Sequence, residues 1–273
     1  MKATKCVDEP GLHLREIVFG NDSASDSLSS FRKEITQPLL GRFTNPRDSI
    51  MKHPVEFLLR IALLAIILLL FWWVIDVRIS NGMNLSIIGA GVLLTFPLVY
   101  LGRKILDRQP TASRAVWVTT FVHFGLGFTL GVPLVRALTT HQNWSGWVLP
   151  IPTEFGWALV IVTGVASFLV VANLALRGLG APFFIALSRK LAVDWLYAWT
   201  RNPMVLAGLA FFLALGIWFQ SLLFVLWVII LFTPALLFFV KEYEERELEI
   251  RFGASYREYK SRTRMLFPRK PRR

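Results

Sequence analysis

Cysteine and histidine are scarce in this sequence, and their scarcity excludes several kinds of site. Among 273 residues there are one cysteine, Cys6, and four histidines. A lone cysteine cannot form an internal disulfide or a metal site with several cysteine ligands. The histidines are scattered along the chain, and no His/Glu spacing resembles a metal site. We therefore expect no bound metal, and no Ser/His/Asp order typical of a hydrolase is present either.

Acidic side chains are also few, because 18 Asp and Glu stand against 30 Lys and Arg, giving a formal net charge of +12. Such a charge is common in nucleic-acid-binding proteins. Here, however, the Lys and Arg residues form short clusters beside apolar runs. Clusters in that position are typical of membrane orientation signals and of contacts with anionic lipids. We therefore expect membrane lipids, and no nucleic acid, as partners.

Apolar residues are abundant: they make up 54% of the chain, and the mean hydropathy is +0.52. This is too apolar for an ordinary soluble domain. The run Met204–Val240 is too long for one membrane crossing, and Gln220-Ser221 marks a turn within it, so it predicts a helical hairpin. The sequence thus predicts an all-α, polytopic integral membrane protein with about six transmembrane helices. The other four predicted spans are residues 57–75, 85–101, 115–138 and 155–176.

The loops between these spans alternate in charge. Lys and Arg are frequent in the N-terminal flank, in residues 102–114 and 177–203, and in the tail from Lys241, whereas residues 139–154 contain none. Because basic loops stay on the cytosolic side, both termini are expected in the cytosol. The predicted organisation is a flexible cytosolic arm (1–54), four transmembrane helices (55–176) and a core of loop, hairpin and amphipathic tail helices (177–273).

A few polar or ionisable residues fall within or beside the predicted spans: His123, Arg136, Glu154 and Asn173. Such groups are costly at membrane depth and are therefore functional candidates. Each could equally serve to bond a neighbouring helix. Gly89, Gly91 and Pro97 indicate a close helix approach or a kink in the second span, and Pro234 is expected to kink the returning helix of the hairpin.

The tripeptide Arg201-Asn202-Pro203 precedes the apolar hairpin and has the residue types of a helix start. Asn is a good N-cap, and Pro suits the first helical position. A helix N-terminus with an arginine beside it favours a carboxylate or phosphate. Capping of a membrane helix at the interface is the other interpretation.

The tail after the hairpin carries the pair Glu244-Glu245 and then a run of charged and aromatic residues. Two carboxylates so near the hydrocarbon suit a ligand amine, although a solvated charged face is the alternative. Tyr256 and Tyr259 continue a helical spacing that predicts an aromatic face lying on the membrane. Gly253 is expected to end one helix, and Ser255-Tyr-Arg-Glu258 to open another as a capping box.

Together these pieces resemble the C-terminal signature of the isoprenylcysteine carboxyl methyltransferase and phospholipid methyltransferase family. The quoted pattern is Gly-x-Gly at 178–180, Tyr197-x-x-x-Arg-Asn-Pro-Met, the hairpin, Glu244-Glu245-x-x-Leu-x-x-x-Phe-Gly-x-x-Tyr-x-x-Tyr, and Pro268. It covers roughly residues 177 to 268. The resemblance implies a membrane enzyme that binds S-adenosylmethionine on the cytosolic side. Its methyl acceptor would be a lipid or small hydrophobic amine, thiol or carboxylate that enters from the bilayer.

The resemblance also implies which residues form the site. Arg201 and Glu244 are expected to act in catalysis. The expected cofactor-binding residues are Gly178, Gly180, Arg189, Lys190, Leu191, Ala192, Tyr197, Asn202, Pro203, Met204, Val205, Glu244 and Glu245.

The chain departs from the prenylcysteine enzymes of this family at several positions. Trp195 stands where a glycine is common, Val205 where they have tyrosine, Asn202 where they have histidine, and Val240 where they have a substrate-binding arginine. The missing arginine argues against a prenylcysteine carboxylate, although the adjacent Lys241 could substitute. Asn-Pro-Met at 202–204 looks like the bacterial branch, so the expected location is a bacterial inner membrane. A sterol-reductase-type enzyme using NADPH and a non-catalytic member of the fold remain the alternatives.

Overall fold

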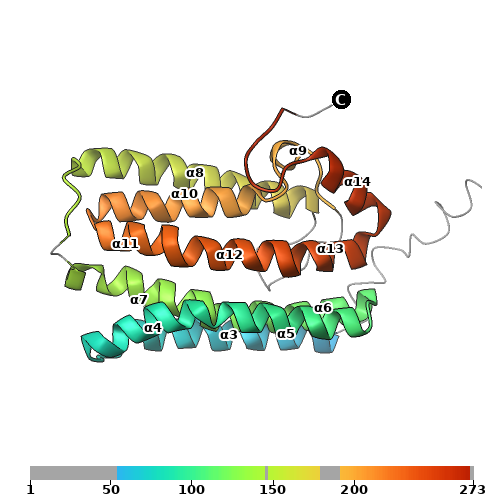
Figure 1. The fold of residues 1–273 in the computed structure, drawn as a ribbon, viewed down its shortest axis with the longest axis horizontal. Helices are drawn as coiled ribbons and strands as arrows, with labels where there is room; N and C mark the ends of the chain where they lie inside the picture. The colour runs from blue at the N-terminus through green and yellow to red at the C-terminus, as the bar shows by residue number, and fades with distance from the viewer. Residues whose placement is uncertain (1–53, 145–146, 179–190, 271–273) are drawn as a thin grey trace, which may run out of the picture. The chain divides into compact units, whose positions relative to one another are not determined.

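The computed structural model describes residues 54–144, 147–178 and 191–270. The chain divides at Pro54, and the helices of the second unit, Val55–Arg273, are shown in Figure 1. Within the described residues the regular structure is helical, and the only strand-like feature is an isolated bridge between Val148 and Ser221. The prediction of an all-α fold is therefore confirmed.

Within the part of the chain that the structure describes, five helical stretches are long and apolar enough to cross a membrane, and the predicted membrane class is confirmed with them. The helix Pro203–Trp218, which was predicted as the fifth span, is equally apolar but shorter. The five long stretches are Leu58–Asp76, Asn81–Arg108, Ala112–Thr140, Thr153–Leu176 and Leu222–Phe252.

The long helical stretches of the first half alternate in direction along the bundle, with α4 continuing into α5 and α6 into α7 (Figure 1). Their bounds are α3 Pro54–Asp76, α4 Asn81–Leu93, α5 Thr95–Arg108, α6 Ala112–Leu126, the π-helical turn η1 Gly127–Gly131, α7 Val132–Thr140 and the 3₁₀ turn η2 His141–Trp144.

The second half contains the hairpin and its flanks. Its elements are α8 Thr153–Gly178, α9 Leu196–Trp199, α10 Pro203–Trp218, α11 Leu222–Trp227, the π-helical turn η3 Val228–Phe232, α12 Thr233–Phe239, the π-helical turn η4 Val240–Glu244, α13 Glu245–Phe252 and α14 Ala254–Arg262.

Prolines account for the main irregularities of the long helices. Leu94 separates α4 from α5 and lies three residues before Pro97. This break is expected, because the ring of a proline clashes with the preceding turn of a helix. The turns η1 and η3 each end two residues before a proline, Pro133 and Pro234. Widening to a π-turn accommodates the carbonyl that the proline cannot bond. The third π-helical turn, η4, has no proline after it and leads into the glutamate pair.

The hairpin turns where the sequence predicted. Gln220 has a positive φ of 53°, and the Ser221 hydroxyl accepts a hydrogen bond from Phe224 N (3.2 Å), which caps α11. Two small residues let α8 lie close against α10. A Cβ on Gly156 would stand 2.6 Å from the backbone of Trp218, and one on Gly164 would stand 3.5 Å from the ring of Phe211. These two contacts set the antiparallel register of α8 and α10.

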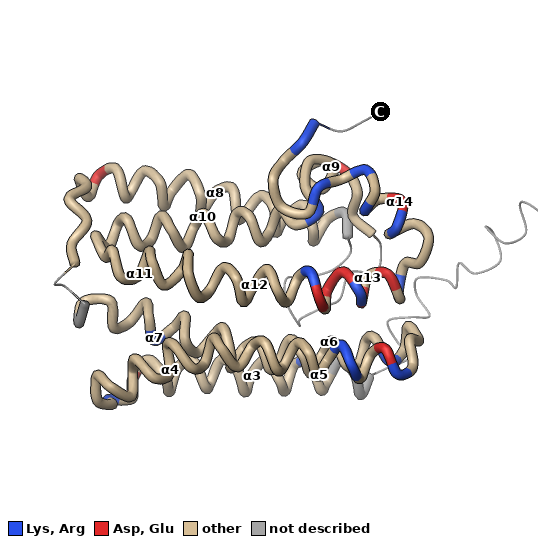
Figure 2. Tube along the Cα trace, viewed as in Figure 1, with Lys and Arg blue, Asp and Glu red and all other residues tan. Residues whose placement is uncertain are grey.

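Charged residues of the second unit gather at one end of the helices (Figure 2). This end comprises the last turns of α5, η4 with α13, and α14. Gly253, with a φ of 56°, ends α13 as predicted. The predicted capping box is wrong, because α14 begins directly at Ala254 and Ser255 lies inside it without capping it.

Candidate active site

The chain that follows α14 returns to the start of α10 and binds it through the backbone. The Arg201 amide donates to the carbonyl of Arg264 (2.8 Å). The Thr200 hydroxyl (3.1 Å) and the Asn202 side-chain amide (2.9 Å) both donate to the carbonyl of Met265. The junction between α9 and α10 is thus held from outside by the tail.

Arg201 is the centre of a buried ion network. Its guanidinium donates to Glu245 Oε1 (2.5 Å) and to the carbonyls of Lys260 (2.9 Å) and Thr263 (2.6 Å). Lys260 binds the other oxygen of Glu245 at 2.8 Å. Burial alone would lower the pKa of Lys260, but hydrogen bonds to Glu245 and Glu249 outweigh it and raise that pKa, so Lys260 stays charged. Glu245 therefore joins α10 to the tail and is occupied by two cations.

Glu244, its neighbour, has no hydrogen bond or ion pair within the described part of the chain. It is the last residue of η4, and it lies close enough to Tyr197 and Tyr256 for its charge to disfavour their ionisation. An acceptor-only carboxylate in such surroundings calls for a cationic or donor partner. The two adjacent glutamates thus differ. Glu245 is bound in ion pairs that stabilise the fold, whereas the carboxylate of Glu244 is available to a ligand.

The N-terminus of α10 is not capped by a side chain. Asn202 occupies the N-cap position, but its amide is used by the tail, so the predicted Asn cap is wrong. The first helical hydrogen bond runs from Leu206 N to Asn202 O (3.1 Å). Pro203 has no N–H, and the amides of Met204 and Val205 have no partner among the described residues. Two unpaired N–H groups at the positive end of a helix form a receptor for an anion.

These two features are neighbours in space. Arg201 directly precedes Asn202, and Glu245 directly follows Glu244. The 2.5 Å contact between Arg201 and Glu245 therefore brings the start of α10 and the end of η4 together. An anion receptor that lies beside a lone carboxylate suits a ligand that carries both a carboxylate and an ammonium.

Three buried tyrosines pack beside this region. Tyr197, Tyr256 and Tyr259 are 9%, 2% and 8% exposed, and the Tyr259 hydroxyl donates to the Tyr197 carbonyl at 2.7 Å. Burial raises the pKa of each phenol, and so does the nearby negative charge of Glu244 for Tyr197. The rings therefore stay neutral. The expectation that Tyr256 and Tyr259 lie on a membrane surface is wrong, because they face the protein.

Asn173 of α8 adds a further polar group at this end. It is 4% exposed, and neither atom of its side-chain amide has a partner among the described residues. Gly164 lies opposite Phe211, so nine further residues along each antiparallel helix set Asn173 level with Asn202. A buried amide without a partner costs free energy, which makes Asn173 a candidate ligand contact.

Several residues expected at the site lie elsewhere or outside the described residues. Gly178 is the last residue of α8, and Leu191 and Ala192 are half-buried in the segment before α9. Gly180, Arg189 and Lys190 fall outside the described residues.

The structure shows the surroundings of two residues, Trp195 and Val240, that depart from the family pattern. Trp195 has a φ of 59° and a ψ of −119°, a conformation that favours glycine, which explains why a glycine is common at that position. Val240 is 1% exposed and belongs to the hydrophobic core, whereas Lys241 is exposed. Successive residues of a helix point in different directions, so Lys241 does not take the place of residue 240.

Two of the polar residues inside the spans, Arg136 and His123, contact backbone carbonyls of a neighbouring helix or of their own helix. Arg136 donates to the carbonyls of Val74 (2.6 Å) and Val77 (3.0 Å) and to the amide oxygen of Asn84 (2.7 Å). It thereby satisfies carbonyls at the C-terminus of α3, at the end of the bundle away from α13. His123 Nδ1 contacts a carbonyl of its own helix at 2.8 Å. Glu154 is exposed in the first turn of α8. The contacts of Arg136 and His123 give these two residues structural roles.

Lys260 and the segment from Thr263 to Met265 are parts of the site that the sequence did not reveal. Lys260 appeared as one cation within a charged run, and residues 263–265 belong to no motif. A helical wheel of α14 would have placed Lys260 beside Tyr256 and so near the same protein face. The described residues contain no group of three or more His, Cys, Asp and Glu arranged to hold a metal ion.

Comparison with known proteins gives one finding. Residues 152–255 match the model of the phospholipid methyltransferase family, a segment that runs from the start of α8 to the second residue of α14. The resemblance that the sequence indicates is thereby confirmed, and it supports a membrane methyltransferase in general terms. No curated protein and no solved structure gives a match.

Proposed function

We propose that the protein transfers a methyl group from S-adenosylmethionine to a lipid or another hydrophobic acceptor. The observation that carries this proposal is the pairing of the uncapped N-terminus of α10 with the unpartnered carboxylate of Glu244. The amino-acid part of S-adenosylmethionine is a zwitterion. Its carboxylate fits the amides of Met204 and Val205, and its ammonium fits Glu244.

The neutral tyrosines also suit this cofactor. A sulfonium is a cation without hydrogen-bond donors, and aromatic rings attract such cations through their faces. Tyr197 and Tyr256 supply rings beside Glu244, and burial keeps both uncharged. Methyl transfer from sulfur to an acceptor needs positioning and exclusion of water more than proton transfer. Buried, neutral surroundings next to one carboxylate provide those conditions.

Arg201 acts indirectly in this scheme. Three of its contacts are to Glu245 and to tail carbonyls, so it holds the start of α10 rather than the ligand. Glu245 has the same role from the other side. The expected catalytic pair Arg201 and Glu244 is therefore divided into a positioning residue and a ligand-contacting residue.

The valine at position 240 indicates which kind of methyl acceptor the protein uses. A valine buried in the core offers no cation where the prenylcysteine enzymes have arginine, and Lys241 points elsewhere. We therefore favour an acceptor without a carboxylate, such as a lipid amine, which reaches the site laterally from the bilayer. The charged end of the bundle, with most basic residues, would face the cytosol.

Cofactor binding by purified protein in detergent tests the proposal. S-adenosylmethionine and its demethylated product should raise the melting temperature, whereas NADPH should not. Glu244→Gln should weaken binding about tenfold or more, because it removes one charged hydrogen bond. The matched control is Glu258→Gln, since Glu258 is 61% exposed and its ion pair among the described residues is with Arg262. Stabilisation by NADPH alone, or equal affinity of wild type and Glu244→Gln, would contradict the proposal.

A further inference from the structure

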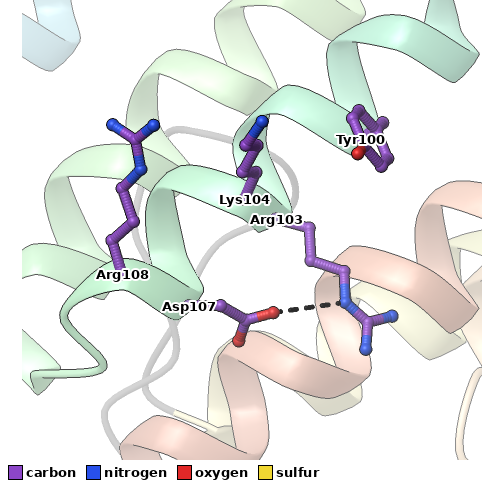
Figure 3. Close-up of a pocket in the computed structure, with 5 residues that line it drawn as sticks. All are labelled: Tyr100, Arg103, Lys104, Asp107 and Arg108. Carbon is purple, nitrogen blue, oxygen red and sulfur yellow. Dashed lines mark ion pairs between the residues drawn. The ribbon is translucent and has the colours of Figure 1, made fainter.

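The last two turns of α5 carry a hollow whose lining residues are not among those of the site described above. Its volume is about 450 Å³, and it is open to the surroundings (Figure 3). The residues that line it all come from α5: Tyr100, Arg103, Lys104, Asp107 and Arg108.

The acidic residue of this hollow is already neutralised. Asp107 contacts Arg103 Nε at 3.5 Å and accepts a hydrogen bond from Arg246 at 2.7 Å. Arg103 also bonds the side chain and the backbone carbonyl of Glu242. These pairs join α5 to η4 and α13, and they leave no carboxylate for the remaining cations of the hollow.

Lys104 and Arg108 are those remaining cations. Both are exposed, and neither has a hydrogen bond or ion pair within the described part of the chain. Tyr100, Lys104 and Arg108 are four residues apart, so they follow one face of α5. In Figure 3 both cationic side chains extend away from the Arg103–Asp107 pair. The hollow thus has two uncompensated positive charges and a phenol hydroxyl.

The surroundings of the hollow are apolar on the membrane side. Leu101 is 55% exposed and Ile105 41% exposed on the same two turns, and Tyr100 is itself 61% exposed. The rest of the stretch Asn81–Arg108 is apolar enough to cross a membrane. The cations therefore lie where a lipid-facing helix leaves the hydrocarbon, which is the level of phospholipid headgroups.

We propose that this hollow is a binding site for an anionic phospholipid. The phosphate and the acidic headgroup would lie between Lys104 and Arg108, with a hydrogen bond from the Tyr100 hydroxyl. The acyl chains would lie along Leu101 and Ile105. Charge complementarity selects an anionic lipid over a zwitterionic one, because the two cations have no counterion among the residues that the structure describes. Occupancy would also stabilise α5 at the turns where it is joined to η4 and α13.

Native mass spectrometry in detergent, with phosphatidylglycerol and phosphatidylcholine of identical chains as probes, tests this site. Wild type should retain phosphatidylglycerol in preference to phosphatidylcholine, and added salt should reduce the preference. Lys104→Ala/Arg108→Ala should weaken phosphatidylglycerol binding about 30-fold, since each basic group near an anionic surface contributes about fivefold and the two contributions multiply.

The control is Arg78→Ala/Arg257→Ala, which removes the same net charge from two exposed arginines outside the hollow. It should bind phosphatidylglycerol as wild type does. Equal loss in both double variants, no preference in wild type, or tighter binding of inorganic phosphate than of the lipid would overturn the proposal. If the first double variant does not fold, Lys104→Gln and Arg108→Gln take its place singly. Each should weaken binding about fivefold, and unchanged affinity in both would equally overturn it.

Discussion

Glu245→Gln tests the division of roles within the glutamate pair. Glu245 and Arg201 have side chains that are 7% and 11% exposed, and they bond at 2.5 Å. The substitution leaves the buried Arg201 guanidinium without a carboxylate partner and takes from Lys260 one of its two carboxylates, so that Lys260 keeps only Glu249. Loss of one member of a buried pair costs about 3 to 5 kcal/mol, because the remaining charge is uncompensated.

The assay is thermal unfolding in detergent, followed by the fluorescence of the tryptophans. For a domain of this size, about 3 to 5 kcal/mol corresponds to a fall in melting temperature of about 10 °C. Glu258→Gln removes an exposed pair with Arg262 and should change stability by less than about 1 kcal/mol. Glu244→Gln should not lower stability, since Glu244 has no hydrogen-bond or ion-pair partner among the described residues.

A double variant compares the removal of one charge of the buried pair with the removal of both charges. Arg201→Met combined with Glu245→Leu removes both charges at once and should recover part of the stability that Glu245→Gln loses, because apolar replacement of a whole buried pair is tolerated. The reasoning is refuted if Glu245→Gln melts within a degree or so of wild type, or if Glu244→Gln is the more damaging of the two.

Three further predictions concern other residues of the same region. Trp195→Gly should be more stable than Trp195→Ala by about 1 to 2 kcal/mol in the same melting assay, the reverse of the usual order, because φ is 59° there; equal stability would contradict the assigned backbone strain. Asn173→Leu should raise the melting temperature of the ligand-free protein, since it removes a buried amide without a described partner, and a fall would show that the amide is bonded. Tyr197, Tyr256 and Tyr259 should ionise well above pH 10 in a spectrophotometric titration, because burial raises the pKa of each phenol. Their contribution to stability is full below the unfolded pKa near 10 and is lost as the pH rises through the folded pKa values. Ionisation of all tyrosines near pH 10 in the folded protein would refute their burial.

The helical class of the protein follows from the sequence because long apolar runs leave few structures that satisfy the backbone. The hairpin turn at Gln220-Ser221 and the end of α13 at Gly253 were predicted for the same kind of local reason, since they depend on neighbouring residues. The capping box at Ser255 failed because the turn at Gly253 leads directly into the next helix.

The site was predicted less completely, because its geometry depends on contacts between distant segments. The sequence singled out Glu244 and Glu245 as a pair, but only the fold shows that Arg201 and Lys260 occupy one and leave the other. Asn202 was expected to cap α10 by its own side chain. The tail, 63 residues later, takes that amide instead and leaves the helix N-terminus uncapped.

The central claim is methyl transfer at the site formed by Glu244 and the start of α10. Its most direct test is incubation of the purified protein with S-adenosylmethionine labelled in the methyl group and a membrane lipid extract, followed by counting of the label in the organic phase. We predict that wild type and Glu258→Gln transfer label to an extractable product. At a subsaturating concentration of the cofactor, the amount of label that Glu244→Gln transfers should be lower by about tenfold or more. Absence of label with wild type, or equal transfer by Glu244→Gln, would contradict the account.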